Sequence, residues 1–350
     1  MKIAVVGCGG IGGVVAGAIA RKNLDLTCVE ANETIAGTLG EKGITIERRG
    51  TEAAYPVRAV SAQNMKKSRF DLIVLSVKNF DLRKAFRDAV PALAEGGFYL
   101  TIQNGLEILS IVKEDPSLRV VAGAVGFNSI MLDVGRYRVT SEGGITVGPL
   151  HISEGTGKTV PWSGRKVDVL KELFEPDIPI ETASSIEGVL WGKLLITCGV
   201  TGLTGAAGLV LGELMRLRTA RKLFYRIAEE GADVAEKAGV RIEKLSGAIN
   251  AARFSSGRGG YPVFVRYLLL KLVGMKYREL KGNVYLDLKR GRKTEIDFIN
   301  GALVKLGKAH GVPTPVNGEI VRVVKEIEEG KRSMRVENLN EILSRVGAWK

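Results

Sequence analysis

The spacing of the glycines near the start of the chain constrains its fold more than any other feature. A short apolar run, residues 2–6, leads directly into Gly7-Cys8-Gly9-Gly10-Ile11-Gly12-Gly13. Gly7, Gly9 and Gly12 have the G-x-G-x-x-G spacing that is typical of a dinucleotide-binding unit when it follows a strand and opens a helix. The first glycine permits a tight turn, the second lets the backbone approach a pyrophosphate, and the third packs helix on strand. We therefore predict a strand at 2–6, a helix at 14–22 with its N-terminus toward the phosphates, and cofactor contacts from Gly7, Gly9, Gly10, Ile11 and Gly12.

An acidic residue follows at the distance such a unit requires. The next predicted strand, residues 24–29, ends at Glu30, 18 residues after Gly12. A carboxylate there accepts hydrogen bonds from a ribose 2′-hydroxyl and repels a 2′-phosphate. The residues that follow, 31–34, contain no arginine that could receive that phosphate. The sequence thus predicts a Rossmann-type site and favours NAD(H) over NADP(H); the alternative is that Glu30 is only a solvated strand end.

Composition narrows the class of protein. The 350 residues suffice for two domains, and 45% hydrophobic with 25% charged residues is ordinary for a soluble enzyme. We find no apolar run of the length that a membrane span needs and expect no membrane partner. Three cysteines without metal-ligand spacing indicate a reducing, cytoplasmic compartment, and two histidines are too few for a histidine-based metal centre. The net charge of +13 is spread along the chain without a nucleic-acid motif, so we expect it to attract anionic substrates and not nucleic acid.

Two further strand ends carry polar residues. Residues 70–78 are predicted as a parallel strand that ends at Lys78, a helix is predicted at 80–95, and a strand at 97–102 delivers Gln103 and Asn104. Ligands of open α/β sheets bind outside the carboxyl ends of the strands. We therefore place Lys78 at the cofactor and Asn104 at the nicotinamide or the substrate; the alternative is that Asn104-Gly105 is only a turn.

The pattern changes near residues 182–185, where strand–helix alternation gives way to helices. We predict an α/β Rossmann-type domain over residues 1–182 and an all-α domain over residues 183–350, which binds substrate and forms the dimer contact. The second domain opens with a long apolar helix, 186 to about 208, on which Lys193, Thr197 and Thr201 share one face at i, i+4 and i+8. A lysine is costly to bury without a purpose. The alternative is a snorkelling lysine above threonines that bond to their own helix carbonyls.

One later segment also has a recognisable start. Residues 293–301, Lys-Thr-Glu-Ile-Asp-Phe-Ile-Asn-Gly, are predicted to begin a helix that runs to His310, with Thr294 as its N-cap.

These motifs together resemble the ketopantoate reductases (2-dehydropantoate 2-reductases) over nearly the whole chain. The resemblance is carried by the N-terminal glycines, Ser76-Val77-Lys78, Gln103-Asn104-Gly105, Trp191-x-Lys193-Leu194, residues 293–301, and Gly311-Val312-Pro313-Thr314-Pro315-x-Asn317. It implies a Rossmann domain followed by an all-helical domain, and reduction of a 2-oxo acid, usually with NADPH.

The resemblance also implies roles for single residues. Lys193 matches a catalytic lysine that protonates the carbonyl oxygen of the substrate, and Asn104 matches an asparagine near nicotinamide and substrate. Lys78 matches a lysine on the cofactor side, Glu295 a carboxylate that supports the substrate site, and Asp287 an acidic position in the same region. A cation with a proton suits carbonyl reduction, because negative charge develops on the oxygen.

The chain departs from the family pattern in its substrate and cofactor positions. Thr197 and Thr201 stand where the family usually has asparagines, and Asn283 stands where it commonly has a substrate-binding serine. Hydroxyls and amides differ in reach and in the number of donors, which predicts an altered pocket. Glu30 replaces a basic cofactor-binding residue. Residues 261–280 look longer than the usual connection and could enlarge the pocket or form a dimer surface.

The leading hypothesis is an NAD(P)H-dependent reductase of a 2-oxo acid in the cytoplasm, a homodimer, with conversion of 2-dehydropantoate to pantoate in pantothenate biosynthesis as the first choice. A second hypothesis keeps the scaffold and changes the substrate to another 2-oxo acid or to the imine of an opine-type dehydrogenase. A third is a non-catalytic, nucleotide-sensing binding protein. Salt-dependent DNA binding would favour a nucleic-acid version of the third.

Overall fold

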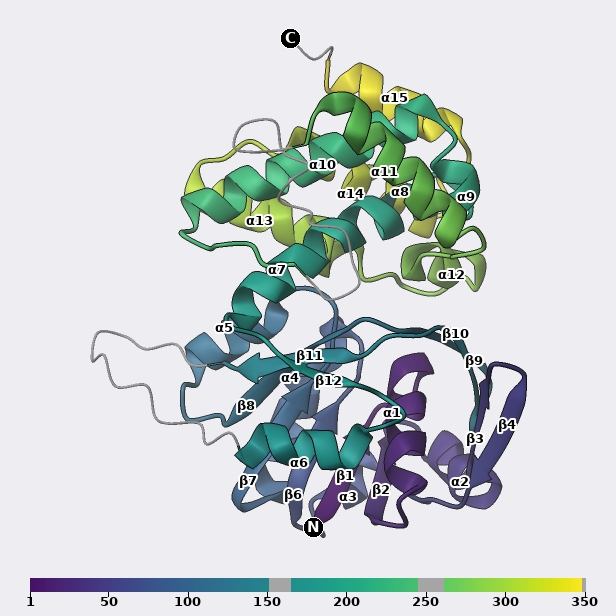
Figure 1. Cartoon of the computed structure of the whole chain (residues 1–350), viewed down its shortest axis with the longest axis vertical. Coiled ribbons are helices and arrows are strands. Elements are labelled where there is room, and N and C mark those ends of the chain that lie inside the picture. Colours follow the sequence, from purple (N-terminus) through teal and green to yellow (C-terminus); the bar gives the residue numbers. More distant parts are fainter. Residues whose placement is uncertain (151–164, 245–260, 348–350) are drawn as a thin grey trace. The chain divides into compact units, whose positions relative to one another are not determined.

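The computed structural model of the chain describes residues 1–150, 165–244 and 261–347 and divides into two compact units (Figure 1). The first unit contains residues 1–103 and 107–186. The second contains residues 104–106, 187–244 and the described residues from 261 onward.

The first unit is built on an eight-stranded sheet whose order reverses at β1. The strands, in order across the sheet, are β12 (Ile180–Thr182), β11 (Ile145–Pro149), β8 (Val120–Val125), β7 (Leu93–Thr101), β6 (Phe70–Leu75), β1 (Lys2–Val6), β2 (Asp25–Glu30) and β5 (Arg58–Ser61). All neighbouring pairs are parallel except β8 with β11. Because β1 lies between β2 and β6, the sheet has the switch point at which doubly wound folds bind ligands.

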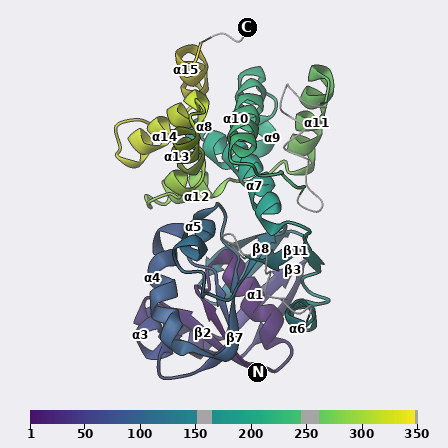
Figure 2. The ribbon, with the colours of Figure 1, turned by 90° about the vertical axis from the view of Figure 1, so that its left-hand side faces the viewer.

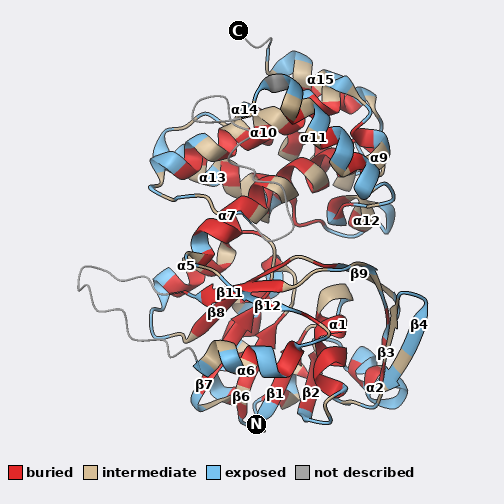
Figure 3. Cartoon of the chain, viewed as in Figure 1, coloured by how far each residue is buried: buried red, intermediate tan, exposed pale blue. Residues whose placement is uncertain are grey.

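Helices cover both faces of this sheet. Helices α1 (Gly10–Ala20) and α6 (Arg165–Phe174) lie on one face, and α3 (Ala62–Met65) and α4 (Asn79–Ala89) lie on the other (Figures 1 and 2). Helix α2 (Glu33–Lys42) packs against β5, and α5 (Glu107–Glu114) packs against α4. The central strands are buried almost throughout (Figure 3), which explains their continuous apolar sequences. The α/β class expected for this half is confirmed.

Several predicted boundaries in this unit were wrong. Helix α1 begins at Gly10 and not at residue 14, so most of the glycine-rich run is helical. The helix predicted at 80–95 ends at Ala89, because Pro91 cannot donate a backbone hydrogen bond, and a short 3-10 turn at Val90–Ala92 follows. Strand β7 consequently starts at Leu93, four residues before the predicted position.

A second, four-stranded sheet accompanies the first. Its order is β4 (Thr51–Tyr55), β3 (Ile44–Arg48), β10 (Arg136–Ser141) and β9 (Asn128–Asp133). Strands β3 and β4 form a hairpin, and β10 pairs in parallel with β3 and antiparallel with β9. The small sheet packs on α1 through β3, β9 and β10.

The described part of residues 187–347 is helical, as expected. Its helices are α7 (Ile186–Thr197), α8 (Leu203–Ala207), α9 (Leu211–Leu214), α10 (Arg218–Lys237), α11 (Val263–Lys276), α12 (Asn283–Lys289), α13 (Asn300–His310), α14 (Pro315–Glu328) and α15 (Glu337–Arg345). A π-helical turn, Cys198–Gly202, separates α7 from α8, so the single helix predicted at 186–208 is interrupted. The α8 segment is contacted by α12, α14 and α15, and the π turn by α10, α12 and α14.

The run from Ile186 to Ala207 is, within the described residues, the only helical stretch long and apolar enough to cross a membrane. Its most apolar window is 78% buried inside the protein, as expected for a core helix.

The helix predicted from residue 293 to His310 begins only at Asn300. The prediction of Thr294 as its N-cap was wrong: the N-cap residue of α13 is Ile299. The Ile296 N–H donates to Thr294 Oγ1 at 3.2 Å, at the start of a 3-10 turn, Ile296–Phe298, whose own N-cap residue is Glu295. The Thr294 N–H and hydroxyl both donate to Glu328 on α14, with the N–H bond at 2.8 Å. This tertiary contact holds residues 294–299 outside the helix.

Candidate active site

Gly7 and Gly12 are glycines for reasons internal to the protein. Gly7 has φ of +86°, and its N–H donates to the Val29 carbonyl at 2.9 Å, which turns the chain sharply at the end of β1. A Cβ on Gly12 would lie 2.0 Å from the Gly7 carbonyl oxygen, a distance that no side chain tolerates. The turn and the close packing expected from the glycine spacing are therefore both present.

Gly9 differs from them, because no contact among the described residues explains it. Its φ of −70° and ψ of −163° are open to any residue, and a Cβ placed there would meet no atom of the described part of the chain within 4 Å. Gly9 is the N-cap of α1, so the free N–H groups and partial positive charge of the helix start lie beside it. The uncrowded backbone fits a phosphate-bearing cofactor that must approach more closely than a Cβ permits.

Glu30 is tied to the same loop. Its carboxylate accepts the Cys8 N–H at 2.5 Å, and burial raises the pKa of Glu30, an effect that the bond from Cys8 opposes. Glu30 is thus not a solvated strand end. One carboxylate oxygen steadies the glycine loop, and the carboxylate keeps further acceptor capacity for a ribose hydroxyl.

The ends of β6 and β7 reach the same edge of the sheet. The Ser76 N–H donates to the Val6 carbonyl at 2.9 Å, and the Gln103 side-chain amide donates to the Leu75 carbonyl at 2.8 Å. Lys78 is the N-cap residue of α4, directly after β6. The structure thereby collects the glycine loop, Glu30 and Lys78 at the carboxyl edge of β1, β2 and β6. Asn104 directly follows Gln103 and is grouped with the second unit.

Lys193 lies on α7 and is half-buried. Burial lowers the pKa of Lys193 to about 7. The glycine before it contributes to this environment, because a Cβ on Gly192 would lie 2.2 Å from the Glu243 carbonyl oxygen. The backbone near Glu243 therefore lies directly against this turn of the helix. A lysine with a pKa near neutrality can give up a proton at physiological pH.

The two threonines after Lys193 use their hydroxyl protons within the helix. Thr197 Oγ1 donates to the Lys193 carbonyl at 2.8 Å, and Thr201 donates to the Thr197 carbonyl. Both threonines thus bond to carbonyls of their own helix and do not present donors outward. Each hydroxyl oxygen can still accept a hydrogen bond, but neither is available as a donor without rearrangement.

Helix α12 places Asn283 and Asp287 close to the π turn. Asn283 is the first residue of α12, and a Cβ on the preceding Gly282 would lie 2.9 Å from Thr201 Cα. The start of α12 and the turn that carries Thr201 are therefore in direct contact. Asp287 lies one turn further along α12 and is buried, and Glu295 is buried next to Thr294.

Sequence reasoning missed a buried network behind the π turn. Glu230 on α10 accepts the Val316 N–H at 2.8 Å, and from Asn317 the N–H at 3.0 Å and the side-chain amide at 2.7 Å. Asn300 donates to Asn317 Oδ1 at 2.9 Å and to the Cys198 carbonyl at 3.4 Å. Burial raises the pKa of Glu230, and its hydrogen bonds oppose that rise. The asparagines belong to the motifs that carry the family resemblance, but the partner acid on α10 has no sequence signal.

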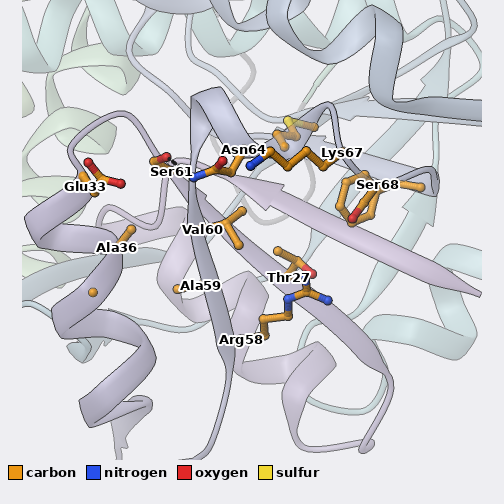
Figure 4. Close-up of a pocket in the computed structure, with 13 residues that line it drawn as sticks. Thr27, Glu33, Ala36, Arg58, Ala59, Val60, Ser61, Asn64, Lys67 and Ser68 are labelled. Carbon is orange, nitrogen blue, oxygen red and sulfur yellow. Dashed lines mark hydrogen bonds between the residues drawn. The ribbon is translucent and has the colours of Figure 1, made fainter.

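A cavity of about 400 Å³ lies elsewhere in the first unit, at the edge strand β5 (Figure 4). It is lined by residues of α2, β5, α3 and the turn after α3, among them Glu33, Arg58, Ser61, Asn64 and Lys67. None of the predicted site residues lines it, although Ser61 is the strand partner of Glu30.

Comparison with known protein families shows to which family the chain belongs. The model described as ketopantoate reductase PanE/ApbA matches residues 3–151, and the model of the C-terminal part of ketopantoate reductase PanE/ApbA matches residues 185–328. The chain belongs to the ketopantoate reductase family. It is an NAD(P)-dependent oxidoreductase acting on a CH–OH group, and the family-level reaction is reduction of a 2-oxo acid.

Individual ketopantoate reductases and one other dehydrogenase are similar at low identity. A 2-dehydropantoate 2-reductase of Archaeoglobus fulgidus is 22% identical over 94% of this chain and 98% of its own. The structure of a PanE/ApbA family ketopantoate reductase from Ralstonia eutropha has a TM-score of 0.77 at 23% identity, covering 95% of this chain and 100% of that one. D-mandelate dehydrogenase with NADH and anilino(oxo)acetate has a TM-score of 0.78 at 21% identity, covering 94% and 99%. A dimeric ketopantoate reductase from Staphylococcus aureus has a TM-score of 0.69 at 15% identity, covering 95% and 100%.

Proposed function

We propose that this ketopantoate reductase family member reduces 2-dehydropantoate to pantoate with NADH, and that Lys193 supplies the proton. The observation that carries the proposal is the partial burial of Lys193 on α7, which lowers its pKa to about 7. A general acid works best when its pKa lies near the operating pH, because a large fraction is then protonated and the group is still acidic enough to transfer the proton.

In the proposed reaction the cofactor, the substrate and the transferred proton are each assigned to particular residues. The N–H groups at the start of α1 and the open backbone at Gly9 would hold the pyrophosphate, and Glu30 would accept from the adenosine ribose. When bound, the nicotinamide supplies a hydride for the carbonyl carbon. The Lys193 ammonium would donate its proton to the carbonyl oxygen and stabilise the charge that develops there. Asn104, Asn283, Asp287 and Glu295 would orient the substrate, and Lys78 would contact the cofactor.

The preference for NADH is supported by the fixed position of Glu30. Because the Cys8 N–H holds this carboxylate at the loop, a 2′-phosphate would meet a negative charge that cannot swing away. The next residues, 31–34, offer no cation in exchange.

A second candidate function is reduction of a different, bulkier 2-oxo acid. Its support is the state of Thr197 and Thr201, whose hydroxyls donate to helix carbonyls and leave only acceptor capacity toward a substrate. The mandelate dehydrogenase structure is titled as a complex with anilino(oxo)acetate, a 2-oxo acid derivative with an aromatic group. The hypotheses of an opine-type imine substrate and of a catalytically inactive nucleotide sensor have no such support of their own.

The deciding experiment is oxidation of NADH and NADPH, followed by absorbance, with 2-dehydropantoate beside a panel of aliphatic and aromatic 2-oxo acids. Lys193→Ala is compared with Lys305→Ala, which removes an exposed lysine of the same unit. Turnover of 2-dehydropantoate that falls at least 100-fold in Lys193→Ala alone supports the proposal and a role in pantothenate biosynthesis. Turnover only of aromatic 2-oxo acids supports the second candidate. NADH binding without turnover of any substrate would contradict both.

We also propose that the protein is a homodimer and that α11 contributes to the contact. Phe264, Leu268, Leu272 and Met275 expose between 46% and 73% of their surface along one stripe of this helix. The stripe is nearly symmetric about residue 270, so a second copy running antiparallel would set Phe264 against Met275 and Leu268 against Leu272, as a two-fold interface requires. The name of the S. aureus relative records a dimer.

We propose a cytoplasmic location for the enzyme. Cys8, Cys28 and Cys198 are all free and buried, which is compatible with a reducing compartment.

A further inference from the structure

Side chains of strands β9 and β10 of the small sheet form hydrogen bonds to the peptide groups of the glycine loop. Tyr137 on β10 donates its phenolic hydrogen to the Cys8 carbonyl at 2.6 Å, and its side chain is only 1% exposed. Ser129 on β9 donates its hydroxyl hydrogen to the Gly10 carbonyl at 2.7 Å. Burial raises the pKa of Tyr137, so the phenol stays protonated and remains a donor at physiological pH.

The contacts with these strands explain the two glycines that the dinucleotide fingerprint does not. A Cβ on Gly13 would lie 2.2 Å from the Tyr137 ring, and a Cβ on Gly10 would lie 2.9 Å from the Ser129 carbonyl oxygen. Gly10 and Gly13 are therefore required by the small sheet, whereas Gly7 and Gly12 are required by the turn and the strand. Only Gly9 is left for a ligand.

Fixing these carbonyls also fixes the N–H groups on the other side of the same peptides. A trans peptide is planar and holds its C=O and N–H in opposite directions. With the Cys8 and Gly10 carbonyls held by β10 and β9, the N–H groups of Gly9 and Ile11 are directed away from the small sheet. The Cys8 N–H is already engaged by Glu30, and the Gly9 and Ile11 N–H groups are directed for an anion.

We propose that Tyr137 and Ser129 are positioning residues that hold the glycine loop ready to accept the pyrophosphate of the cofactor. The inference rests on the proposed dinucleotide function. A glycine-rich backbone loses much conformational freedom when it becomes ordered on binding, and that ordering costs free energy. Because the small sheet orders the loop when the protein folds, less of the free energy of cofactor binding is spent on ordering it.

The test is Tyr137→Phe, with Tyr99→Phe as the matched control. Tyr99 on β7 is also about 1% exposed, lies in the same unit, and packs its ring on Phe86 of α4, on the sheet face opposite α1. We expect the dissociation constant of NADH, measured by fluorescence, to rise about fivefold in Tyr137→Phe and to stay unchanged in Tyr99→Phe. The KM for NADH should rise by the same factor while kcat at saturation stays constant, because Tyr137 does not touch the reacting atoms.

A ligand series separates positioning from general damage. ADP-ribose contains the pyrophosphate, and adenosine contains no phosphate. Tyr137→Phe should weaken competition by ADP-ribose about fivefold and leave competition by adenosine unchanged. Ser129→Ala, which removes a half-buried hydroxyl, should act in the same direction and serves if Tyr137→Phe does not fold.

The outcomes separate the two levels of inference. An NADH affinity that is unchanged in both loop variants, or lowered equally in Tyr99→Phe, would overturn the positioning role alone. A wild-type protein that binds neither NADH nor NADPH would overturn the proposed function and the positioning role with it.

Discussion

A single methyl group at Gly9 would separate the demands of the fold from those of the cofactor. In Gly9→Ala the new Cβ meets no atom of the residues that the structure describes within 4 Å, and the backbone angles suit alanine. Restricting the unfolded chain contributes about 0.4–1 kcal/mol of stability. Alanine is a poorer N-cap than glycine by a similar amount. The free energy of unfolding should therefore change by less than about 1 kcal/mol.

The same methyl group should cost most of the cofactor affinity. It would occupy the space into which the pyrophosphate must come to reach the N–H groups at the start of α1. One lost hydrogen bond to a charged group corresponds to about 1.5–3 kcal/mol, and each 1.4 kcal/mol is a factor of ten. We expect the dissociation constant of NADH to rise about 10- to 100-fold.

Gly12→Ala is the contrasting variant. Its Cβ would lie 2.0 Å from the Gly7 carbonyl oxygen, which neither strand nor helix can avoid without moving. Overpacking of this kind costs about 3 kcal/mol, or roughly 10 °C in Tm for a unit of this size. Thermal unfolding and NADH fluorescence titration of both variants make the comparison. A Gly9→Ala protein that unfolds like Gly12→Ala, or that binds NADH as the wild type does, would refute the assignment of Gly9 to the cofactor.

Three further predictions concern charge and assembly. Because Lys193 must be protonated to act as the acid and its pKa is about 7, kcat/KM should be constant below pH 7 and fall about tenfold per unit above it; a profile flat to pH 9 would exclude Lys193 as the donor. Because the pKa of Glu30 is raised, its carboxylate is neutralised as the pH falls, and discrimination against NADPH should then weaken. Glu30→Gln should abolish that pH dependence. If Glu30→Gln leaves the ratio of NADH affinity to NADPH affinity unchanged, the ribose lies elsewhere. In an antiparallel α11 pair, two copies of residue 271 lie about 3 Å apart along the axis and two copies of residue 276 about 18 Å apart, so Lys271→Cys should form a disulfide-linked dimer under mild oxidation and Lys276→Cys should not. Equal cross-linking of both, or a monomer by light scattering, would refute this interface.

Features encoded within a short stretch of chain were predictable from the sequence. The strand, glycine turn, helix and second strand up to Glu30 follow one another without a gap, and Gly7, Gly12 and Glu30 make their contacts within this stretch. Lys193 lies on α7, as local periodicity predicted, whereas Lys78 was predicted as the last residue of a strand and is instead the N-cap of α4, three residues after β6 ends. Their catalytic and binding roles stay predictions.

Features that depend on distant partners were not predictable. The pairing of β3 with β10 joins segments about 90 residues apart, and no pattern in either segment selects the other. Thr294 carries the sequence of an α-helix N-cap, but Glu328 takes its hydroxyl and the helix starts six residues later. Thr197 and Thr201 were predicted to share one face with Lys193, yet spacing alone cannot say whether a hydroxyl points outward or bonds back to its own helix.

Because Tyr137 and Ser129 bond to the glycine loop, the nucleotide-binding motif of this protein cannot be moved to another protein by itself. A fragment of residues 1–30, grafted onto another sheet, would bring five glycines at positions 7–13 without the strands that hold two of them in place. The graft would have the correct sequence motif, but its glycine loop would not be held in one conformation. Gly13 and Tyr137 are 124 positions apart, yet an alanine at the first is compatible only with a smaller residue at the second. An engineer who wishes to move or re-specify this cofactor site should therefore treat the small sheet as part of it.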